Sequence, residues 1–424
     1  MKKILTIFSI IIISLFLLSL FGWMVHQISN KNKEFGIITE PVKFMYKFPN
    51  LFKESVKEVK TLPKTFIPTP KDFKPVNKLQ KDVFVLTTYT NAKKSRQVAL
   101  MNLKNDSVLK KWTIQKPFKP HTRIKHTMLH PDGSLIYQLF SKPFNGLYKI
   151  DSAGNQIWRQ KKLTFHHSIN LDKDGNIWAC TRKHPWKYSG KYQLGNFFVY
   201  YNDHSITKID GKTGKILFNK SITELLKEND LANYALKSSK PEDPFHLNDV
   251  QPALKTTPYY QKDDLFISLR NIHMILHYRP STNELINTLS GPFVNQHDID
   301  ILNDSTLVMF NNNTFVDVKR ESKKPHIEKG LVSLGRFASN IIGYNFKTGS
   351  FSVIGDSVFK KNKIYTYTEG LVEFIDSSTY FVEEQNSGLL WIIKDNEVVY
   401  KNVFKSQHKG HHHLPNWTRI INYD

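Results

Sequence analysis

Histidines lie near the start of three stretches of the chain that are rich in β-forming residues. These stretches are FHHSINL at 165–171, DPFHLNDV at 243–250 and GPFVNQHDI at 291–299. A neutral imidazole can act as a nucleophile, and near neutral pH it can also donate or accept a proton. The three stretches are therefore candidates for the part of the protein that carries out chemistry.

The second stretch is followed by further polar groups in the run DLFISLRN at 264–271. Because side chains alternate along a strand, His246 and Asn248 are expected to share one face, and Ser268 and Arg270 are expected to share another. A guanidinium offers a planar fork of donors to an anion. Each pair alone is also explained by ordinary structural hydrogen bonds or ion pairs. Imidazoles, a carboxamide and a guanidinium together favour a reaction site.

The other histidines and the cysteine content indicate no metal centre. The loop QHKGHHH near the C-terminus is typical of solvated or adventitious metal-binding sequence, and His126 and His130 have no partner motif. Cys180 stands alone, which excludes an intramolecular disulfide and a cysteine-rich zinc module. We therefore predict no metal site.

Turn signals recur through the body of the chain from residue 82 onward. Phrases such as DSAGNQIW at 151–158 and DKDGNIW at 172–178 combine Asp or Asn, a nearby Gly and a β-forming run. Asp or Asn near Gly supplies the positive φ that tight hairpin turns need. Turns about twenty residues apart imply two hairpins in roughly forty residues, which is the size of a four-stranded propeller blade. Residues 82–424 are long enough for six or seven such blades, and two packed sandwiches are the alternative.

One helix is expected within this all-β body, over residues 222–236. Ser221 and Glu224 have the spacing of a capping box, in which each side chain satisfies a backbone N–H of the first helical turn. We interpret this helix as an insertion between strands.

An apolar run from Ile4 to Val25 follows two lysines at the N-terminus. A membrane span takes about 20 such residues, whereas the apolar core of a cleaved signal peptide has about 7–15. We therefore predict a transmembrane signal anchor over 1–29, and a cleaved signal peptide with a long core is the alternative. In both cases the body is exported, and we expect it on the extracytoplasmic, periplasmic side of the membrane.

Prolines and lysines recur over residues 30–81, most densely in KTLPKTFIPTPKDFKPVNKLQK at 60–81. This composition is typical of an extended, semi-rigid linker or stalk, and residues 35–52 could form a short helix. The predicted organisation is thus an anchor over 1–29, a stalk over 30–81 and a β-propeller over 82–424.

The chain is strongly basic. Against 37 Asp and Glu residues it has 60 Lys and Arg residues, which gives a formal net charge of +23. Such an excess favours anionic partners: nucleic acid, a membrane surface, or sulfated and phosphorylated small molecules. Because the body is exported, we expect no nucleic-acid partner.

The ordered series of motifs resembles the bacterial arylsulfate sulfotransferases, and especially their smaller, membrane-anchored branch. The resemblance covers about residues 150–420 and rests on HHSINLDKDGNIW, DPFHLNDVQP, DLFISLRN, GPFVNQHDIDIL with VMFNNN, EEQNSGLLW and NWTR. It implies a six-bladed β-propeller that moves a sulfuryl group from a phenolic sulfate ester to a phenol. It also implies that no adenylyl sulfate donor, cofactor or metal takes part.

The resemblance also assigns roles to individual residues. His297, in the Gln-His-Asp motif, is implied to be the nucleophile that becomes transiently sulfated. His246 is implied to act as general acid and then base, while Arg270 and His167 stabilise the sulfuryl oxygens. Asn248 and His166 are expected to bind substrate, and of the neighbouring pair His167 is preferred to His166 for the catalytic position.

Two other classes of function remain open at this point. The first is a non-catalytic exported propeller that binds anionic or sulfated ligands, which needs the basic surface but not an intact set of His297, His246 and Arg270. The second is a scaffold for an envelope complex, which predicts exposed apolar patches. Propellers host many functions, so the fold alone does not decide among them.

Overall fold

The computed structural model describes residues 2–29, 35–60, 62–63, 65–90, 96–114, 124–140, 144–183, 188–315, 332 and 334–421. The chain divides into two compact units, Met1–Pro63 and Lys64–Asp424. The predicted boundaries at residues 29/30 and 81/82 stay a prediction.

The N-terminal unit is helical. It contains α1 (Lys2–Ser29), η1 (Gly36–Ile38) and α2 (Thr39–Lys60). The segment Lys3–Ser29 is long and apolar enough to cross a membrane, a property that signal sequences near an N-terminus share. In α2, the side chains of Phe44, Met45 and Phe48 are exposed, so this helix extends further than the predicted short helix and presents apolar groups to its surroundings.

Antiparallel strands build the C-terminal unit, and five of its sheets have four strands each. Their orders across the sheet are β29 (Arg419–Ile421), β3 (Phe84–Thr90), β4 (Arg96–Asn102), β5 (Ser107–Ile114); β6 (Ile124–Leu129), β7 (Leu135–Leu139), β8 (Gly146–Ile150), β9 (Gln156–Gln160); β10 (Leu163–Leu171), β11 (Ile177–Lys183), β14 (Ser205–Ile209), β15 (Ile216–Ser221); β16 (Leu247–Pro252), β17 (Leu265–Leu269), β18 (Met274–Arg279), β19 (Glu284–Leu289); and β20 (His297–Asn303), β21 (Thr306–Asn311), β22 (Asn340–Asn345), β23 (Ser350–Ile354).

The last sheet is larger. It runs β1 (Phe66–Pro68), β28 (His411–His413), β27 (Glu397–Lys405), β26 (Leu389–Lys394), β25 (Thr379–Glu384), β24 (Leu371–Phe374), and β2 (Val76–Asn77) also pairs with β27. Both β1 and β2 come from the segment predicted as stalk. The backbone of that segment is thus partly paired with the sheet, which its proline content did not indicate.

The remaining elements are insertions and connections. The hairpin of β12 (Gly190–Leu194) and β13 (Phe197–Tyr201) lies between β11 and β14 in the chain. The helical pieces are α3 (Ile222–Glu228), η2 (Ala232–Lys237), η3 (Arg270–Ile272) and α4 (Asp356–Asn362). The hydroxyl of Ser221 accepts a hydrogen bond from the backbone N–H of Glu224, so the predicted N-cap of α3 is confirmed.

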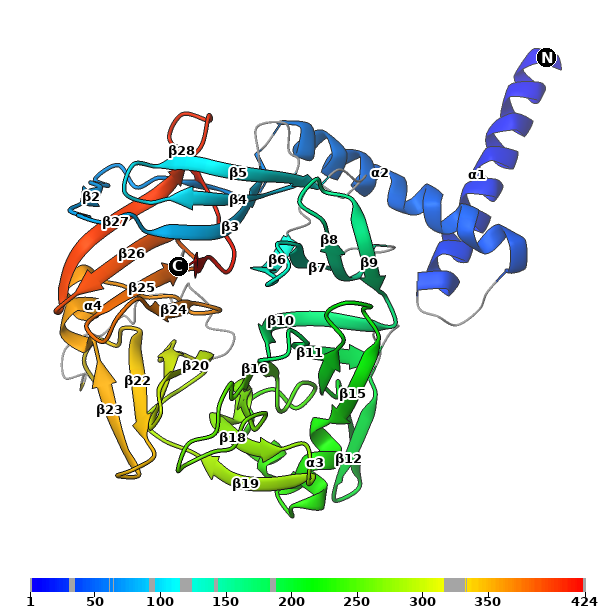
Figure 1. The fold of residues 1–424 in the computed structure, drawn as a ribbon. Coiled ribbons are helices and arrows are strands. Elements are labelled where there is room, and N and C mark those ends of the chain that lie inside the picture. The colour runs from blue at the N-terminus through cyan, green and yellow to red at the C-terminus, as the bar shows by residue number, and fades with distance from the viewer. Residues whose placement is uncertain are drawn as a thin grey trace. The chain divides into compact units, whose positions relative to one another are not determined.

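The sheets follow one another around a common centre, with β6, β10, β16, β20 and β24 facing the middle (Figure 1). The C-terminal strand β29 pairs with β3, so the two ends of this unit meet in one sheet. Apolar side chains fill the spaces between sheets: Trp178 and Leu269 share one buried cluster, and Phe381 and Trp417 share another. The arrangement is a β-propeller that follows an N-terminal apolar helix in the chain, and this confirms the predicted architecture.

Carboxylates tie neighbouring inner strands together. Asp249 of β16 accepts a hydrogen bond from the N–H of Ile299 in β20 at 2.6 Å. Asp298 of β20 accepts from Val372 in β24 at 2.7 Å, and Glu373 of β24 accepts from Ile420 in β29 at 2.7 Å. The inner strands therefore hold one another through side chains, because their inner edges have no further strand to pair with.

Candidate active site

A residue in the left-handed conformation lies within, or up to two residues before, the innermost strand of each sheet around the centre. These residues are His126 (φ 48°), His167 (57°), His246 (48°), Asp298 (54°), Glu369 (57°) and Trp417 (55°). Non-glycine residues in this region cost roughly 1–3 kcal/mol and are frequent at functional sites. The pairing of β6, β10, β16 and β20 shifts register beside them. Strand alternation therefore fails at the positions that face the centre.

His297 is the first residue of β20 and is 1% exposed. Its Nδ1 atom lies 2.6 Å from Oδ1 of Asn312 and 3.1 Å from the backbone oxygen of Asn295. A carbonyl oxygen can only accept, so Nδ1 carries the proton and Nε2 has the lone pair. The Nε2 atom is buried and has no hydrogen-bond partner among the described residues. Burial, and then the charge of Arg270, lower the pKa of His297 to about 4, so this imidazole is neutral at pH 7.

Arg270 begins η3 directly after β17, so it does not belong to the strand on which it was predicted. Its Nε donates to Oδ1 of Asn271 at 3.0 Å, and its backbone N–H donates to the carbonyl of His246 at 3.2 Å. The positive charge of Arg270 contributes to lowering the pKa values of His167, His246 and His297, after burial as the main cause for all three. The guanidinium thus lies close to the three imidazoles that the sequence nominated.

The imidazoles of His167 and His246 form a hydrogen-bonded pair. Their Nε2 atoms are 2.8 Å apart, and their ring centroids are 4.8 Å apart. The ring centroid of His297 lies 6.1 Å from that of His167. Burial holds the pKa values of His167 and His246 well below the usual range. The pair is therefore a short proton-sharing unit next to the candidate nucleophile.

Asp243 contacts His246 through the ring nitrogen that does not face His167. Its Oδ2 lies 2.5 Å from Nδ1 of His246, and its Oδ1 lies 2.9 Å from Nε2 of His204. Burial alone would raise the pKa of Asp243, but His246 and His204 bring it well below the usual range. The carboxylate is thus ionised and shared by two imidazoles.

The two predicted substrate-binding residues lie at opposite sides of this cluster. The ring of His166 packs edge-on against His204 with centroids 4.7 Å apart, and both of its ring nitrogens are enclosed with no partner among the described residues. Asn248 is fully buried, and its Nδ2 donates to the backbone oxygen of Gln296 at 2.7 Å. This contact holds the peptide directly before His297, and binding of substrate by either residue stays a prediction.

Among the described residues, two groups of side chains have the composition of a metal site, and one of them lies in this cluster. Ligand atoms of His204, Asp243 and His246 all lie within 4.8 Å of one another. However, both imidazoles stand at hydrogen-bond distance from the carboxylate, 2.5 Å and 2.9 Å. Two ligands of one tetrahedral Zn²⁺, each at about 2.0–2.1 Å, would be about 3.4 Å apart. The observed spacing fits shared protons better than a shared metal ion.

The structure brings together all the nominated catalytic residues and adds others. His167, His246, Arg270 and His297 interact as described above. Sequence reasoning missed Asp243, His204, Asn271 and Asn312, and it gave no role to His126, whose buried ring lies 4.2 Å from the ring of Trp417 and 6.3 Å from that of His167. The expected sharing of a face by His246 and Asn248 was wrong, because His246 precedes β16 in a left-handed conformation and a register shift follows it.

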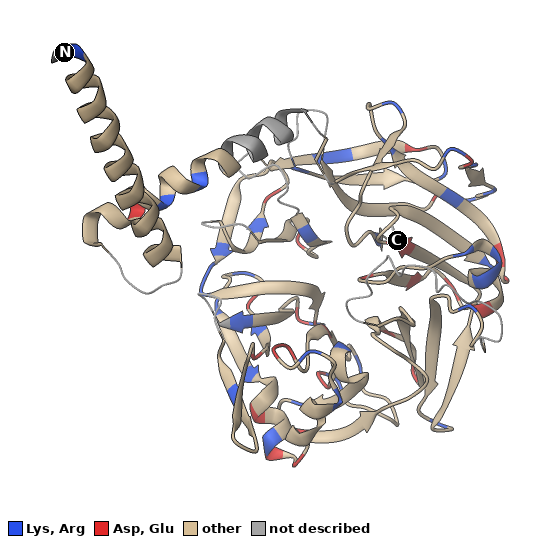
Figure 2. Cartoon of the chain, turned by 180° about the vertical axis from the view of Figure 1, so that it is seen from behind, with Lys and Arg blue, Asp and Glu red and all other residues tan. Residues whose placement is uncertain are grey.

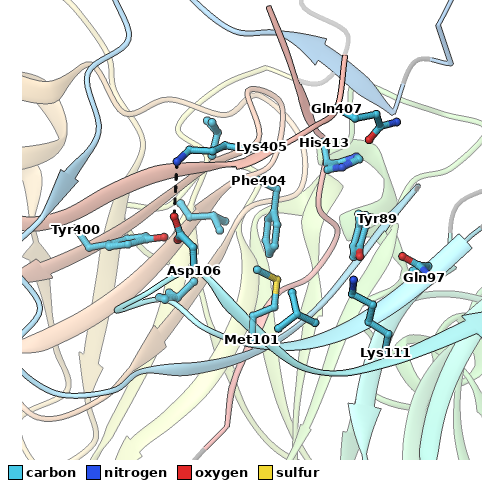
Figure 3. A pocket seen from close by; sticks show the side chains of 14 residues that line it. Tyr89, Gln97, Met101, Asp106, Lys111, Tyr400, Phe404, Lys405, Gln407 and His413 are labelled. Atoms are coloured by element: carbon cyan, nitrogen blue, oxygen red, sulfur yellow. Dashed lines mark ion pairs between the residues drawn. The ribbon is translucent and has the colours of Figure 1, made fainter. Parts of the chain in front are cut away.

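Two hollows lie elsewhere on the C-terminal unit. One, of about 420 Å³, has an apolar floor that includes Met101 and Phe404, with Tyr89 and Lys111 at its side and the ion pair of Lys405 and Asp106 across it at 3.9 Å (Figure 3). The other, of about 610 Å³, is lined by Asp300, Glu373 and Arg419 among others. Neither contains a residue of the histidine cluster.

Lys and Arg positions occur on the helices and on several sheets of the described chain, with acidic positions between them (Figure 2). That nucleic acid is not a partner stays a prediction.

Comparison with solved structures shows the fold. A protein of unknown function from Bacteroides caccae aligns with a TM-score of 0.50 at 9% identity, covering 81% of this chain and 100% of that one. A streptogramin B lyase aligns with a TM-score of 0.41 at 11% identity, covering 81% of this chain and 88% of that one. A virginiamycin B lyase from Staphylococcus aureus aligns with a TM-score of 0.38 at 12% identity, covering 81% and 89%. The alignment with the Bacteroides caccae protein concerns architecture alone and says nothing about activity.

Comparison with sequences identifies the family. No curated protein matches the chain. Residues 126–405 match the family model described as arylsulfotransferase (ASST), and this range includes the inner strands that carry His167, His246 and His297. Because the match extends over well over half of the chain, the family predicted from the motifs is confirmed: the chain belongs to the arylsulfotransferase (ASST) family.

Proposed function

We propose that this protein transfers a sulfuryl group from a phenolic sulfate ester to a phenolic acceptor through an N-sulfated His297. The observation that carries this proposal is the buried Nε2 of His297, which has no hydrogen-bond partner in the part of the chain that the structure describes and whose lone pair is fixed by the proton on Nδ1. Membership of the arylsulfotransferase family supports the same class of reaction.

In the first half-reaction, Nε2 of His297 attacks the sulfur atom of the donor. The new N–S bond forms as the bond between sulfur and the phenolic oxygen breaks. An imidazole with a pKa of about 4 is fully neutral at pH 7, so no proton has to leave before attack. A covalent intermediate divides one difficult transfer into two easier steps and gives ping-pong kinetics.

Arg270 is proposed to bind the equatorial oxygens of the group in transit. By analogy with phosphoryl transfer, such catalysis consists mostly of positioning and stabilisation of charge. The guanidinium is oriented by its hydrogen bond to Asn271 and lies in the same electrostatic environment as His297. A planar donor fork can contact two oxygens at once, which a lysine cannot do.

The hydrogen-bonded pair of His246 and His167 is proposed to manage the proton. Because burial lowers the pKa values of both rings, the pair carries an extra proton in only part of the molecules at neutral pH. In those molecules the departing phenolate takes that proton, so that phenol leaves. In the second half-reaction the acceptor phenol returns a proton to the pair while its oxygen attacks sulfur and the N–S bond breaks. His297 then recovers its lone pair, and the protons balance over the cycle.

The competing classes of function have no need of this arrangement. A binding protein for sulfated ligands requires donors but no imidazole with a fixed, buried lone pair, and an envelope scaffold requires neither. No cofactor or metal is needed along the proposed route, because the residues named above supply the nucleophile, the charge and the proton.

The test is a transfer assay with the full-length protein in detergent. Release of 4-nitrophenolate from 4-nitrophenyl sulfate should depend on added phenol, and intact-mass analysis without acceptor should find one added SO₃ that maps to His297. The variant His297→Asn should lack both signals. A wild type as inactive as His297→Asn with a range of phenolic acceptors would favour the binding function instead.

The organisation of the chain is proposed to follow the prediction, with one extension. We propose that β24–β27 form the sixth blade, with β1, β2 and β28 added at its edge, and that α1 is an uncleaved anchor over residues 1–29. The linker over 30–81, from which β1 and β2 pair with that blade, would then join the anchor to a propeller over 82–424 on the periplasmic side. The exposed aromatic side chains of α2 suit a helix lying at the membrane surface.

A further inference from the structure

The shared carboxylate of Asp243 fixes the protons on two histidines. An ionised carboxylate has acceptors and no donor, so both imidazoles that contact it must donate. His246 therefore carries its proton on Nδ1, which lies 2.5 Å from Oδ2, and His204 carries its proton on Nε2, which lies 2.9 Å from Oδ1. Neither assignment depends on the orientation of an amide.

This assignment determines the state of the next hydrogen bond. With a proton on Nδ1, neutral His246 has a lone pair on Nε2, so the 2.8 Å contact with His167 must be donated by Nε2 of His167. When the pair gains one more proton, the positive charge is most stable on His246, because that ring is the one in contact with the carboxylate. The pair can then release this proton again through the same hydrogen bond.

The loop of Asp243 is also connected to the residue that is proposed to bind sulfate oxygens. Nδ2 of Asn271 donates to the backbone oxygen of Asp243 at 2.7 Å, and Oδ1 of Asn271 accepts from Nε of Arg270 at 3.0 Å. One carboxamide thus sets the position of the carboxylate relative to the guanidinium. Asn271 therefore contacts both the residue that orients the histidine pair and the residue that is proposed to bind sulfate oxygens.

We propose that Asp243, held in place by His204, is a positioning residue that makes the His167–His246 pair the proton store of the reaction. This inference rests on the proposed function and assigns two residues that the motifs did not indicate. Each cycle lends one proton from the pair to the departing phenolate and recovers one from the acceptor phenol, so no further reactant is needed.

The variant Asp243→Asn tests this role. An asparagine offers one acceptor oxygen and one donor NH₂, so it cannot accept from both imidazoles, and His204 or His246 must change its tautomer. We expect kcat for phenyl sulfate to fall about 10²–10⁴-fold, as for a lost tautomer-fixing carboxylate in other enzymes. The loss should be much smaller for 4-nitrophenyl sulfate, because nitrophenolate can leave without a proton.

A matched control is Asp264→Asn. Asp264 is also a buried carboxylate in contact with a histidine, with 2.9 Å between its Oδ2 and Nε2 of His277, and it is not part of the site. This variant should keep the wild-type ratio of rates for the two donors. Selective ¹⁵N-histidine labelling should report the Nδ1–H tautomer of His246 in the wild type and in Asp264→Asn.

A second variant protects the test against misfolding of Asp243→Asn. His204→Phe leaves His246 as the one imidazole in contact with the carboxylate, while Nη2 of Arg182 stays 3.9 Å from Oδ2 of Asp243. The nearby charge of His204 then no longer opposes protonation of His246. The part of the pH–rate profile that is due to protonation of the His167–His246 pair should then move to higher pH. An unchanged profile in His204→Phe, or an equal loss for both donors in a folded Asp243→Asn, would overturn the proposal.

The outcomes also separate this inference from the proposed function. If the wild type transfers no sulfuryl group, the proposed function fails. The tautomer of His246 by NMR still decides whether Asp243 has the assigned role, since that signal requires no turnover. An Nε2–H tautomer of His246 in the wild type would overturn the positioning role even in an active enzyme.

Discussion

Oδ1 of Asn312 accepts a hydrogen bond from Nδ1 of His297 at 2.6 Å, and the amide of Asn312 cannot turn over. Its Nδ2 donates to the backbone oxygens of Thr366 and Glu369, at 2.8 Å and 2.6 Å. Because both of those oxygens are acceptors, the amide oxygen must face His297. The lone pair of His297 is thereby confined to Nε2, and a residue 15 positions later in the sequence determines which nitrogen can attack.

The first prediction concerns this contact. Replacing Asn312 by Ala should lower the rate of His297 sulfation about 10²–10⁴-fold, because the imidazole loses its fixed tautomer and orientation. Rapid-quench measurement of the sulfated protein gives this rate directly. The neighbouring variant Asn313→Ala, which removes a donor to Ala338 at 3.1 Å, is the control. Equal losses in the two variants would mean that Asn312 acts through general stability.

A second prediction follows from the low pKa of His297. Protonation removes the attacking lone pair, so the rate of sulfation should remain level from pH 7 down to about pH 5 and should fall through pH 4. Burial is the main cause of this low pKa and the charge of Arg270 is the next, so Arg270→Met should move the fall to higher pH. Burst kinetics with 4-nitrophenyl sulfate measure both profiles. A fall centred near pH 6.5 in the wild type would show that His297 is not in the environment described here.

Much of the fold was accessible from the sequence because its signals are local. In the turn DKDGN, the carboxylate of Asp172 accepts from the N–H groups of Asp174 and Asn176, and Gly175 has φ 77°. All the contacts that decide such a hairpin lie within five residues. The cap of α3 was predictable for the same reason, but the helix ends at Glu228 instead of 236, since Asp230 is left-handed (φ 58°) and the chain continues as η2.

The site was predictable in its residue types and not in its connections. Asn312 meets Thr366, and His204 meets Asp243, across 54 and 39 residues, and no spacing rule relates such positions. Asp243, three residues before His246, was the one visible sign of a supporting carboxylate. The left-handed residues of the inner strands invalidated the alternation argument, because each of them ends the regular pleat at the place where the site begins.

A third prediction concerns Arg270. Its replacement by Lys keeps the charge but removes the fork, so kcat/KM for aryl sulfates should fall about 10²–10³-fold, the usual loss for one oxyanion donor. The matched control is Arg279→Lys, because Arg279 makes a bidentate contact with Asp264 outside the site, at 2.7 Å and 2.8 Å. Steady-state kinetics with several donors provide the measurement. If the two variants behave alike, Arg270 has no special contact with the transferred group.

A fourth prediction concerns the anchor. The mature protein should remain in the membrane fraction after carbonate washing and should retain residues 1–29 by N-terminal mass analysis, because α1 is long enough to span a bilayer. Deleting residues 2–29 tests the same point, since the truncated chain should no longer be recovered from membranes through that helix. A soluble mature form that begins after residue 29 would establish a cleaved signal peptide instead.

The last prediction concerns the hollow of about 610 Å³ that Asp300 and Glu373 help to line. Burial, followed by the charge of Glu373, raises the pKa of Asp300 to about 8, and burial raises the pKa of Glu373 to about 7. Between their ordinary values and these raised values the folded protein binds more protons than the unfolded chain. The free energy of unfolding must therefore fall as the pH rises through 7 to 8.

The window from pH 7.5 to 8.5 isolates this effect. The buried histidines have pKa values lowered from 6.5, so above pH 7.5 they are largely neutral in both folded and unfolded chains and contribute little slope. Asp300→Asn should flatten the decline, and its gain in the free energy of unfolding should be about 2 kcal/mol larger at pH 8.5 than at pH 6.5, since one pKa unit corresponds to about 1.4 kcal/mol. Urea unfolding at a series of pH values measures this difference. Asp376 lines the same hollow, but hydrogen bonds from backbone N–H groups lower its pKa, so Asp376→Asn should leave the slope unchanged. Parallel pH curves for the wild type and Asp300→Asn would show that Asp300 is ionised at neutral pH and is stabilised there by Arg419.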